Sequence, residues 1–193
     1  MAALMVTMAL GGALAAAGCA AESTAGAPDF HYANADYGFT LNVPADFVVG
    51  HPKGSNARHS GLLFTVAFAN PQGTIVSGKA VDVVEVAVYK LNRTASSSDV
   101  GTHEADFEGI AAKLIGRPEG LQVAAPFALT KLGGVPALTT TYVFRASGQD
   151  IATIAYLVPR GKRLYWVTAQ AARENWDQSG QRLSSLTKSF AFD

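Results

Sequence analysis

The stretch of residues 151–170 reads IATIAYLVPRGKRLYWVTAQ, and it decides the fold class. Two apolar runs, residues 151–158 and 163–170, flank the tetrapeptide Pro159-Arg160-Gly161-Lys162. This tetrapeptide predicts a tight turn, because proline fixes φ and glycine accepts positive φ. Two strand-like runs that are joined by a short turn pair antiparallel, so we expect a β-hairpin here.

Five other segments show the alternation of apolar and small or polar side chains that is typical of strands. Turn signals separate several of them: Asn70-Pro71-Gln72-Gly73, Gly133-Gly134 and Ser147-Gly148. Neighbouring strands with short connections favour antiparallel pairing. The five segments are residues 37–43, 62–68, 81–91, 121–129 and 138–144.

Two segments have helical spacing of their apolar residues instead. In residues 99–116 the helix is expected to begin at Ser98 or Asp99 as a cap, and the second helix is expected within residues 173–190. About seven strands and two separated helices predict an α+β domain, in which two helices pack on a mostly antiparallel sheet.

The N-terminal segment carries no charged side chain from Met1 to Ala21, although the chain has 15 basic and 15 acidic residues. An apolar run that ends in small residues is typical of an export signal. The last part, Leu14-Ala15-Ala16-Ala17-Gly18-Cys19, resembles the lipobox of bacterial lipoproteins, although no Lys or Arg precedes the apolar run. This resemblance implies that the Cys19 sulfur carries diacylglycerol and that its amine carries a further acyl chain such as palmitate.

We therefore expect a signal peptide at residues 1–18, a lipid-anchored tether at residues 19–28, and one domain at residues 29–193. The expected location is the extracytoplasmic face of the cell membrane. An ordinary secretory signal, or an uncleaved anchor with an incidental cysteine, is the alternative. Because Cys19 is the only cysteine, the domain folds without an internal disulfide.

The charge composition excludes one class of partner. The net charge is +0 and charged residues make up 16% of the chain. Binding to nucleic acid needs a basic surface, so no nucleic acid partner is expected.

Three motifs resemble the PsbP-like domains. They are Tyr37-Gly38-Phe39-Thr40-Leu41-Asn42-Val43-Pro44, then Leu132-Gly133-Gly134-Val135-Pro136-Ala137, and a Tyr165-Trp166-Val167-Thr168 strand that precedes a last helix ending at Ser189-Phe190. Within that group the chain is similar to the actinobacterial LpqN-type lipoproteins. The resemblance implies an αβα arrangement and a binding or accessory role, and it brings no catalytic residue with it.

The sequence indicates no catalytic and no metal-binding residue. The nucleophile motif Gly-x-Ser-x-Gly is absent from the sequence, and so are the phosphate-binding glycine motifs, so no cofactor is expected. His103, Glu104, Asp106 and Glu108 are close in sequence, but they do not share one helical face. We interpret them as a solvated acidic face near a helix N-terminus.

Basic residues gather in two predicted loops, Lys53 and Arg58 in one and Arg160, Lys162 and Arg163 in the other. Each such residue gains about 1 kcal/mol near an anionic lipid surface. These five residues are therefore candidate contacts with anionic headgroups, although polar loops are common on any domain.

The predicted function is that of a non-catalytic binding or accessory module of the cell envelope, anchored to the membrane by lipid. Its candidate partners are an envelope protein or an apolar ligand. The alternative is a carrier or chaperone of lipid or another apolar small molecule, and an enzyme ranks third. A carrier needs an apolar slot, for which the candidate lining is Phe107, Ile110, Leu114, Trp166 and Trp176.

Overall fold

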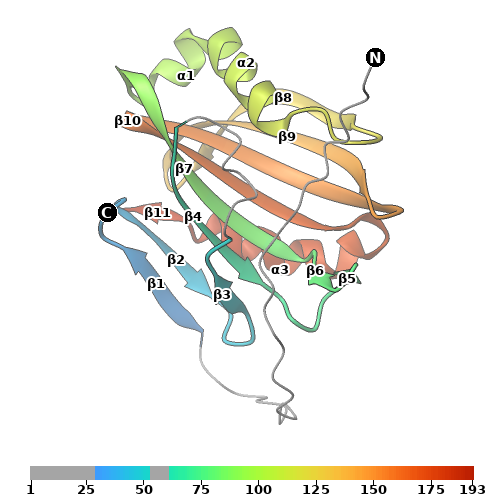
Figure 1. Cartoon of the computed structure of the whole chain (residues 1–193). Helices are drawn as coiled ribbons and strands as arrows, with labels where there is room; N and C mark the ends of the chain where they lie inside the picture. The colour runs from blue at the N-terminus through green and yellow to red at the C-terminus, as the bar shows by residue number, and fades with distance from the viewer. Residues whose placement is uncertain (1–28, 53–60) are drawn as a thin grey trace.

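The computed structural model describes residues 29–52 and 61–193 (Figure 1). Cys19 and the predicted signal and tether segments lie outside the described residues, as do Lys53 and Arg58. The elements in chain order are β1 (Phe30–Asn34), β2 (Phe39–Val43), β3 (Val48–Gly50), β4 (Leu62–Ala69), β5 (Ile75–Val76), β6 (Lys79–Ala80), β7 (Val83–Ala95), α1 (Asp99–Thr102), α2 (Glu104–Ile115), β8 (Gln122–Leu132), β9 (Val135–Ala146), β10 (Gln149–Ala172), the 3-10 helix η1 (Arg173–Asn175), α3 (Trp176–Lys188) and β11 (Ala191–Phe192).

The main sheet has the order β3-β4-β7-β10-β9-β8, and every pairing in it is antiparallel. A smaller sheet has the order β1-β2-β11, and β5 and β6 form a short ribbon. The prediction of a mostly antiparallel sheet is therefore confirmed.

β10 contains the turn that was predicted between two strands. Its first part pairs with β9 from Gln149 to Leu157, whereas its second part pairs with β7 from Gly161 to Gln170. A straight strand of 24 residues would be about 80 Å long. Ile154 and Ala169 nevertheless line the same small cavity, so the two parts lie side by side. The chain reverses near Gly161, whose φ of 66° suits a turn.

The prediction of two helices is too simple, because residues 29–52 and 61–193 contain three α-helices. The first predicted helix is divided into α1 and α2 at His103, whose φ of −122° and ψ of 38° interrupt the helical backbone. Ser98 is the residue before α1, as expected, but its side chain makes no capping hydrogen bond. The second predicted helix begins as η1 and continues as α3.

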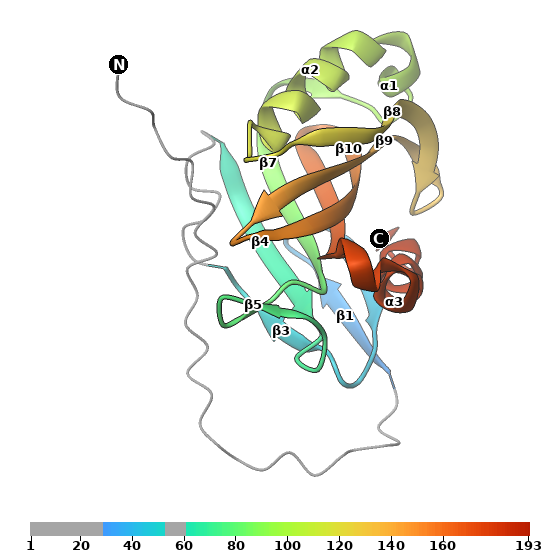
Figure 2. The ribbon, with the colours of Figure 1, turned by 90° about the vertical axis from the view of Figure 1, so that its right-hand side faces the viewer.

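The helices cover both faces of the main sheet (Figures 1 and 2). α1 and α2 pack on β9 on one face, while α3 packs on β10, β7 and β2 on the other. Alternate residues of β7 pack on opposite faces of the sheet. Val86 and Val88 belong to the core below α3, whereas Ala87 and Tyr89 belong to the core below α2. This is the αβα arrangement that the sequence resemblance implied.

The core below α3 is rich in aromatic side chains. Phe39 stacks on Phe190, with 5.5 Å between the ring centres, and Tyr165 packs edge-on to Phe192 at 4.9 Å. The buried Tyr165 hydroxyl donates a hydrogen bond of 2.6 Å to the backbone carbonyl of Tyr37. These contacts join β2, β10 and the C-terminal segment, so they fix α3 against the sheet.

Candidate functional site

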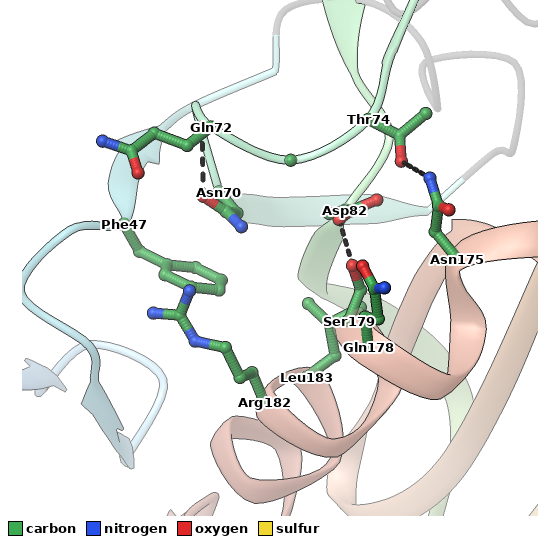
Figure 3. A pocket seen from close by; sticks show the side chains of 11 residues that line it. Phe47, Asn70, Gln72, Thr74, Asp82, Asn175, Gln178, Ser179, Arg182 and Leu183 are labelled. Carbon is green, nitrogen blue, oxygen red and sulfur yellow. Dashed lines mark hydrogen bonds between the residues drawn. The ribbon is translucent and has the colours of Figure 1, made fainter.

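The candidate site is a polar groove of about 370 Å³ between the β4–β7 connection and the N-terminal half of α3 (Figure 3). Phe47 contributes one wall from the loop between β2 and β3. Asn70, Gln72, Gly73 and Thr74 come from the segment after β4. The third wall is the start of α3 with the residue before it, Asn175, Gln178, Ser179, Arg182 and Leu183, and Asp82 lies between these walls.

Asp82 is the most unusual residue of the groove, because its side chain is charged but only 1% exposed. Its Oδ2 accepts a short hydrogen bond from the Ser179 hydroxyl, and its backbone carbonyl accepts one of 2.9 Å from the amide of Asn70. Within the described residues no donor reaches its Oδ1, which is buried. A buried carboxylate oxygen without a donor costs free energy, and this cost marks Asp82 as a candidate ligand contact.

The predicted turn at residues 70–73 places one backbone segment directly against Asp82. The Gly73 amide donates to the Asn70 carbonyl at 3.1 Å, and the Gln72 amide donates to Asn70 Oδ1 at 3.1 Å. A Cβ atom on Gly73 would lie 2.5 Å from Asp82 Oδ2 and 2.8 Å from Asp82 Cγ. The absence of a side chain at Gly73 therefore permits the close approach of the turn to the carboxylate.

Arg182, at the rim of the groove, is the one cationic side chain among the described lining residues. This guanidinium binds the Asp46 carboxylate with N···O distances of 2.6 and 2.8 Å and lies 5.2 Å from the Phe47 ring centre. Asn175 Nδ2 donates to Thr74 Oγ1 at 2.9 Å and closes the opposite end. The charge of Arg182 is thus balanced by Asp46, so the inner part of the groove presents acceptors and one buried anion.

The structure brings together the three basic residues predicted around residue 160, at the reversal of β10. Arg160 donates to the Asp193 carbonyl at 2.9 Å and lies 4.8 Å from the Phe192 ring centre. Arg163 lies 5.0 Å from the Tyr37 ring centre, and Lys162 is exposed. Lys53 and Arg58 lie outside the described residues, so the relation of the two basic groups stays a prediction.

The described part of the chain contains no group of three or more His, Cys, Asp and Glu residues that could hold a metal ion. His103 instead occupies the junction of α1 and α2. Glu104 and Asp106 lie in the first turn of α2, and Asp106 forms an ion pair of 3.0 Å with Arg93. This is the arrangement expected of an acidic solvated face.

The apolar slot that the sequence suggested does not form from the expected residues. Trp166 belongs to the core below α2, whereas Trp176 packs against the core below α3 on the other face of the sheet. The two indoles cannot line one slot, because the sheet lies between them. Phe107 is buried in the core below α2, and Ile110 and Leu114 pack against that core.

No pattern in the sequence indicated the groove. Asp82 lies within a segment that predicted a strand, residues 81–91, and Ser179 lies in the last predicted helix. One signal was present, namely a single aspartate between Val81 and Val83 at the start of an apolar run. A charge at such a position is either solvated at a strand end or buried with a partner, and only the tertiary structure distinguishes the two.

Comparison with known proteins identifies the fold. No family model and no curated protein matches the sequence. A solved structure of cyanobacterial PsbP (CyanoP) from Synechocystis sp. PCC 6803 is similar with a TM-score of 0.58 and 14% identity, over 88% of this chain and 96% of that chain. The fold is PsbP-like.

Two further structures are similar. A protein from Bacteroides thetaiotaomicron has a TM-score of 0.54 and 11% identity over 86% of this chain, which spans 48% of that protein. LpqN, which is involved in cell envelope biogenesis of Mycobacterium tuberculosis, has a TM-score of 0.49 and 13% identity over 86% of each chain. At these sequence identities the similarity shows the fold alone.

Proposed function

We propose that this protein is a lipid-anchored extracytoplasmic module of the cell envelope that binds a ligand or partner in the groove beside α3 and performs no catalysis. The observation that carries the binding role is Asp82, a buried carboxylate with one oxygen that lacks a donor among the described residues, at the inner wall of an open polar groove. Binding of a complementary group would remove the cost of that buried oxygen. We assign the same module to the LpqN type on the motifs around Tyr37 and Leu132.

The anchor is proposed from the lipobox-like segment that ends at Cys19. Two or three acyl chains on one residue would hold the domain at the membrane, whereas a single chain gives only marginal binding. Residues 19–28 would then link the lipid to β1, which begins at Phe30. The helices of the described ranges, 29–52 and 61–193, include none that is long and apolar enough to cross a membrane.

The position of β1 relates the anchor to the groove. Phe30 pairs with Val43 at one end of β1, while Asn34 pairs with Phe39 at the other. The chain runs from Val43 to Phe47, a wall of the groove, so the groove lies toward the end of β1 where the tether would enter. Arg163 contacts Tyr37 near the other end of β1. Arg160, Lys162 and Arg163 would therefore contact lipid headgroups only if the domain rotates on its tether.

The binding role can be tested by photo-crosslinking in the native envelope. A photoreactive phenylalanine analogue replaces Gln178, which is exposed on the groove wall, and the matched control replaces the exposed Lys131 on β8. We expect an adduct of one defined mass from position 178 and none of that mass from position 131. Equal labelling at both positions, or no adduct from the folded protein at position 178, would show that the groove is not a binding site.

A further inference from the structure

The buried carboxylate of the groove is not balanced by a cation among the described residues. Asp82 Oδ1 is buried and without a donor among the described residues, while Oδ2 is already bound by Ser179. Within the described lining of the groove the only cationic side chain is Arg182, and Asp46 binds it through both carboxylate oxygens. A buried carboxylate is compensated by a cation that also donates hydrogen bonds, and none of the described residues supplies one at Asp82 Oδ1.

We propose that the groove binds a primary ammonium group, which donates to Asp82 Oδ1. This inference rests on the proposed function and names the ligand class of the same groove. An ammonium group has three N–H donors and needs several acceptors around it. Asp82 supplies the charged acceptor, and the amide side chains of Asn70, Asn175 and Gln178 supply further oxygen atoms along the walls (Figure 3).

The chemistry of the groove favours an ammonium group over a metal ion. Calcium sites use six to eight oxygen ligands, and magnesium sites combine one or two carboxylates with waters and substrate phosphates in octahedral geometry. Asp82 is the only carboxylate among the described lining residues. Asp46 is nearby, but it lies outside the lining and binds Arg182. One carboxylate with neutral amide and hydroxyl groups suits a singly charged organic cation.

The size and access of the groove agree with a small ligand. Its volume of about 370 Å³ lies at the lower end of the range for small-molecule sites. Gln72 and Gln178 of the lining are exposed, so the groove opens to solvent, and a ligand that reaches the buried Asp82 Oδ1 has to displace neighbouring side chains. Gly73 keeps the inner wall free of a side chain at the carboxylate.

A primary ammonium group could reach the groove from two sources. One is a free amine in the space outside the membrane. The other is the ethanolamine headgroup of a lipid, since the groove lies toward the end of β1 where the proposed tether enters. Both sources offer the same chemistry to Asp82, so the experiment contains one arm for each.

The first arm titrates ethanolamine into the full chain in phosphatidylcholine vesicles, followed by isothermal titration calorimetry. Choline is the matched ligand control, because its quaternary nitrogen has the same charge but no N–H donor. Asp82→Asn is the test variant: its side-chain oxygen can still accept from Ser179, and its backbone carbonyl still accepts from Asn70, so it should fold. Asp106→Asn, on the exposed face of α2, is the matched control variant.

We expect saturable binding of ethanolamine to the natural protein and to Asp106→Asn, at least 10-fold weaker binding to Asp82→Asn, and at least 10-fold weaker binding of choline. Circular dichroism verifies that Asp82→Asn is folded. Three results would each overturn the proposal: no saturable binding of ethanolamine in the first arm together with no rise of the melting temperature in the second, equal binding by Asp82→Asn, or equal binding of choline.

The second arm replaces part of the phosphatidylcholine in the vesicles by phosphatidylethanolamine and measures the melting temperature of the anchored chain. A rise in the natural protein that is lost in Asp82→Asn supports the proposal with the headgroup as source. Saturable binding in the first arm alone supports it with a free amine as source. Failure of both arms with a retained adduct at position 178 overturns the ammonium assignment only, whereas loss of that adduct as well overturns the proposed function.

Discussion

Replacement of Gly73 by alanine tests how tightly the turn is packed against Asp82. The new Cβ would lie 2.5 Å from Asp82 Oδ2, which is 0.9 Å short of the 3.4 Å at which ordinary contact begins. Asp82 cannot turn away easily, because Ser179 holds its carboxylate and the β4–β7 connection holds its backbone. Overpacking of this kind costs about 1–3 kcal/mol. The lower entropy of the unfolded Ala variant offsets about 0.4–1 kcal/mol of it.

We therefore expect Gly73→Ala to lower the free energy of unfolding by about 1–2 kcal/mol. For a domain of this size the melting temperature should fall by about 2–8 °C, measured by circular dichroism. Gly109→Ala is the matched control, since a Cβ there meets nothing within 4 Å on the exposed side of α2. It should raise stability by up to about 1 kcal/mol. A Gly73→Ala variant as stable as Gly109→Ala would refute the close packing of the turn on Asp82.

Three further predictions concern other parts of the domain. Tyr165→Phe should lower the free energy of unfolding by about 0.5–1.5 kcal/mol in a urea titration, because the Tyr37 carbonyl loses its donor, and an unchanged midpoint would contradict the role of this hydrogen bond. Burial, with a smaller contribution from the Glu85 carboxylate, raises the pKa of Tyr89 and Tyr142 above the ordinary value of 10.0, so the folded state favours the neutral phenols. The contribution of these two phenols to stability is complete below pH 10 and decreases as the pH rises above it. Alkaline unfolding should therefore shift to higher pH in Tyr142→Phe. Ionisation of both phenols near pH 10 in the folded protein would disprove their burial. In a Cys19→Ala background, which lacks the proposed lipid anchor, Lys53→Gln with Arg58→Gln should weaken binding to anionic vesicles by about 1 kcal/mol per residue at low salt. Binding that is insensitive to charge and salt would count against headgroup contacts.

Local patterns in the sequence predicted β4, β7, β8, β9 and β10 of the main sheet and β2 of the smaller sheet, but not the short β3. The alternation in residues 37–43 and 62–68 predicted β2 and β4, and the proline and glycine at 159 and 161 predicted the reversal inside β10. β1 was missed because it is a short edge strand with mostly exposed side chains, so it shows little apolar alternation. The division of the first helix at His103 also has no strong signal, since neither proline nor glycine occupies that position.

The groove could not be predicted, because its geometry depends on contacts between distant segments. Ser179 and Asp82 are 97 residues apart, and Arg182 meets Asp46 from 136 residues away. The sequence shows an aspartate among valines, but its burial follows from the packing of α3 over the start of β7. The expectation of an apolar slot failed for the same reason: the pattern could not tell which face of the sheet Trp166 and Trp176 occupy.

The attachment of lipid to Cys19 is the central claim, and mass spectrometry of the N-terminal peptide of the native protein tests it most directly. A mature chain that begins at Cys19 with diacylglycerol on its sulfur and an acyl chain on its amine is the predicted result, together with release into the soluble fraction when Cys19 is replaced by alanine. A native chain that retains Met1, carries no acyl mass and is found in the soluble fraction would contradict the account.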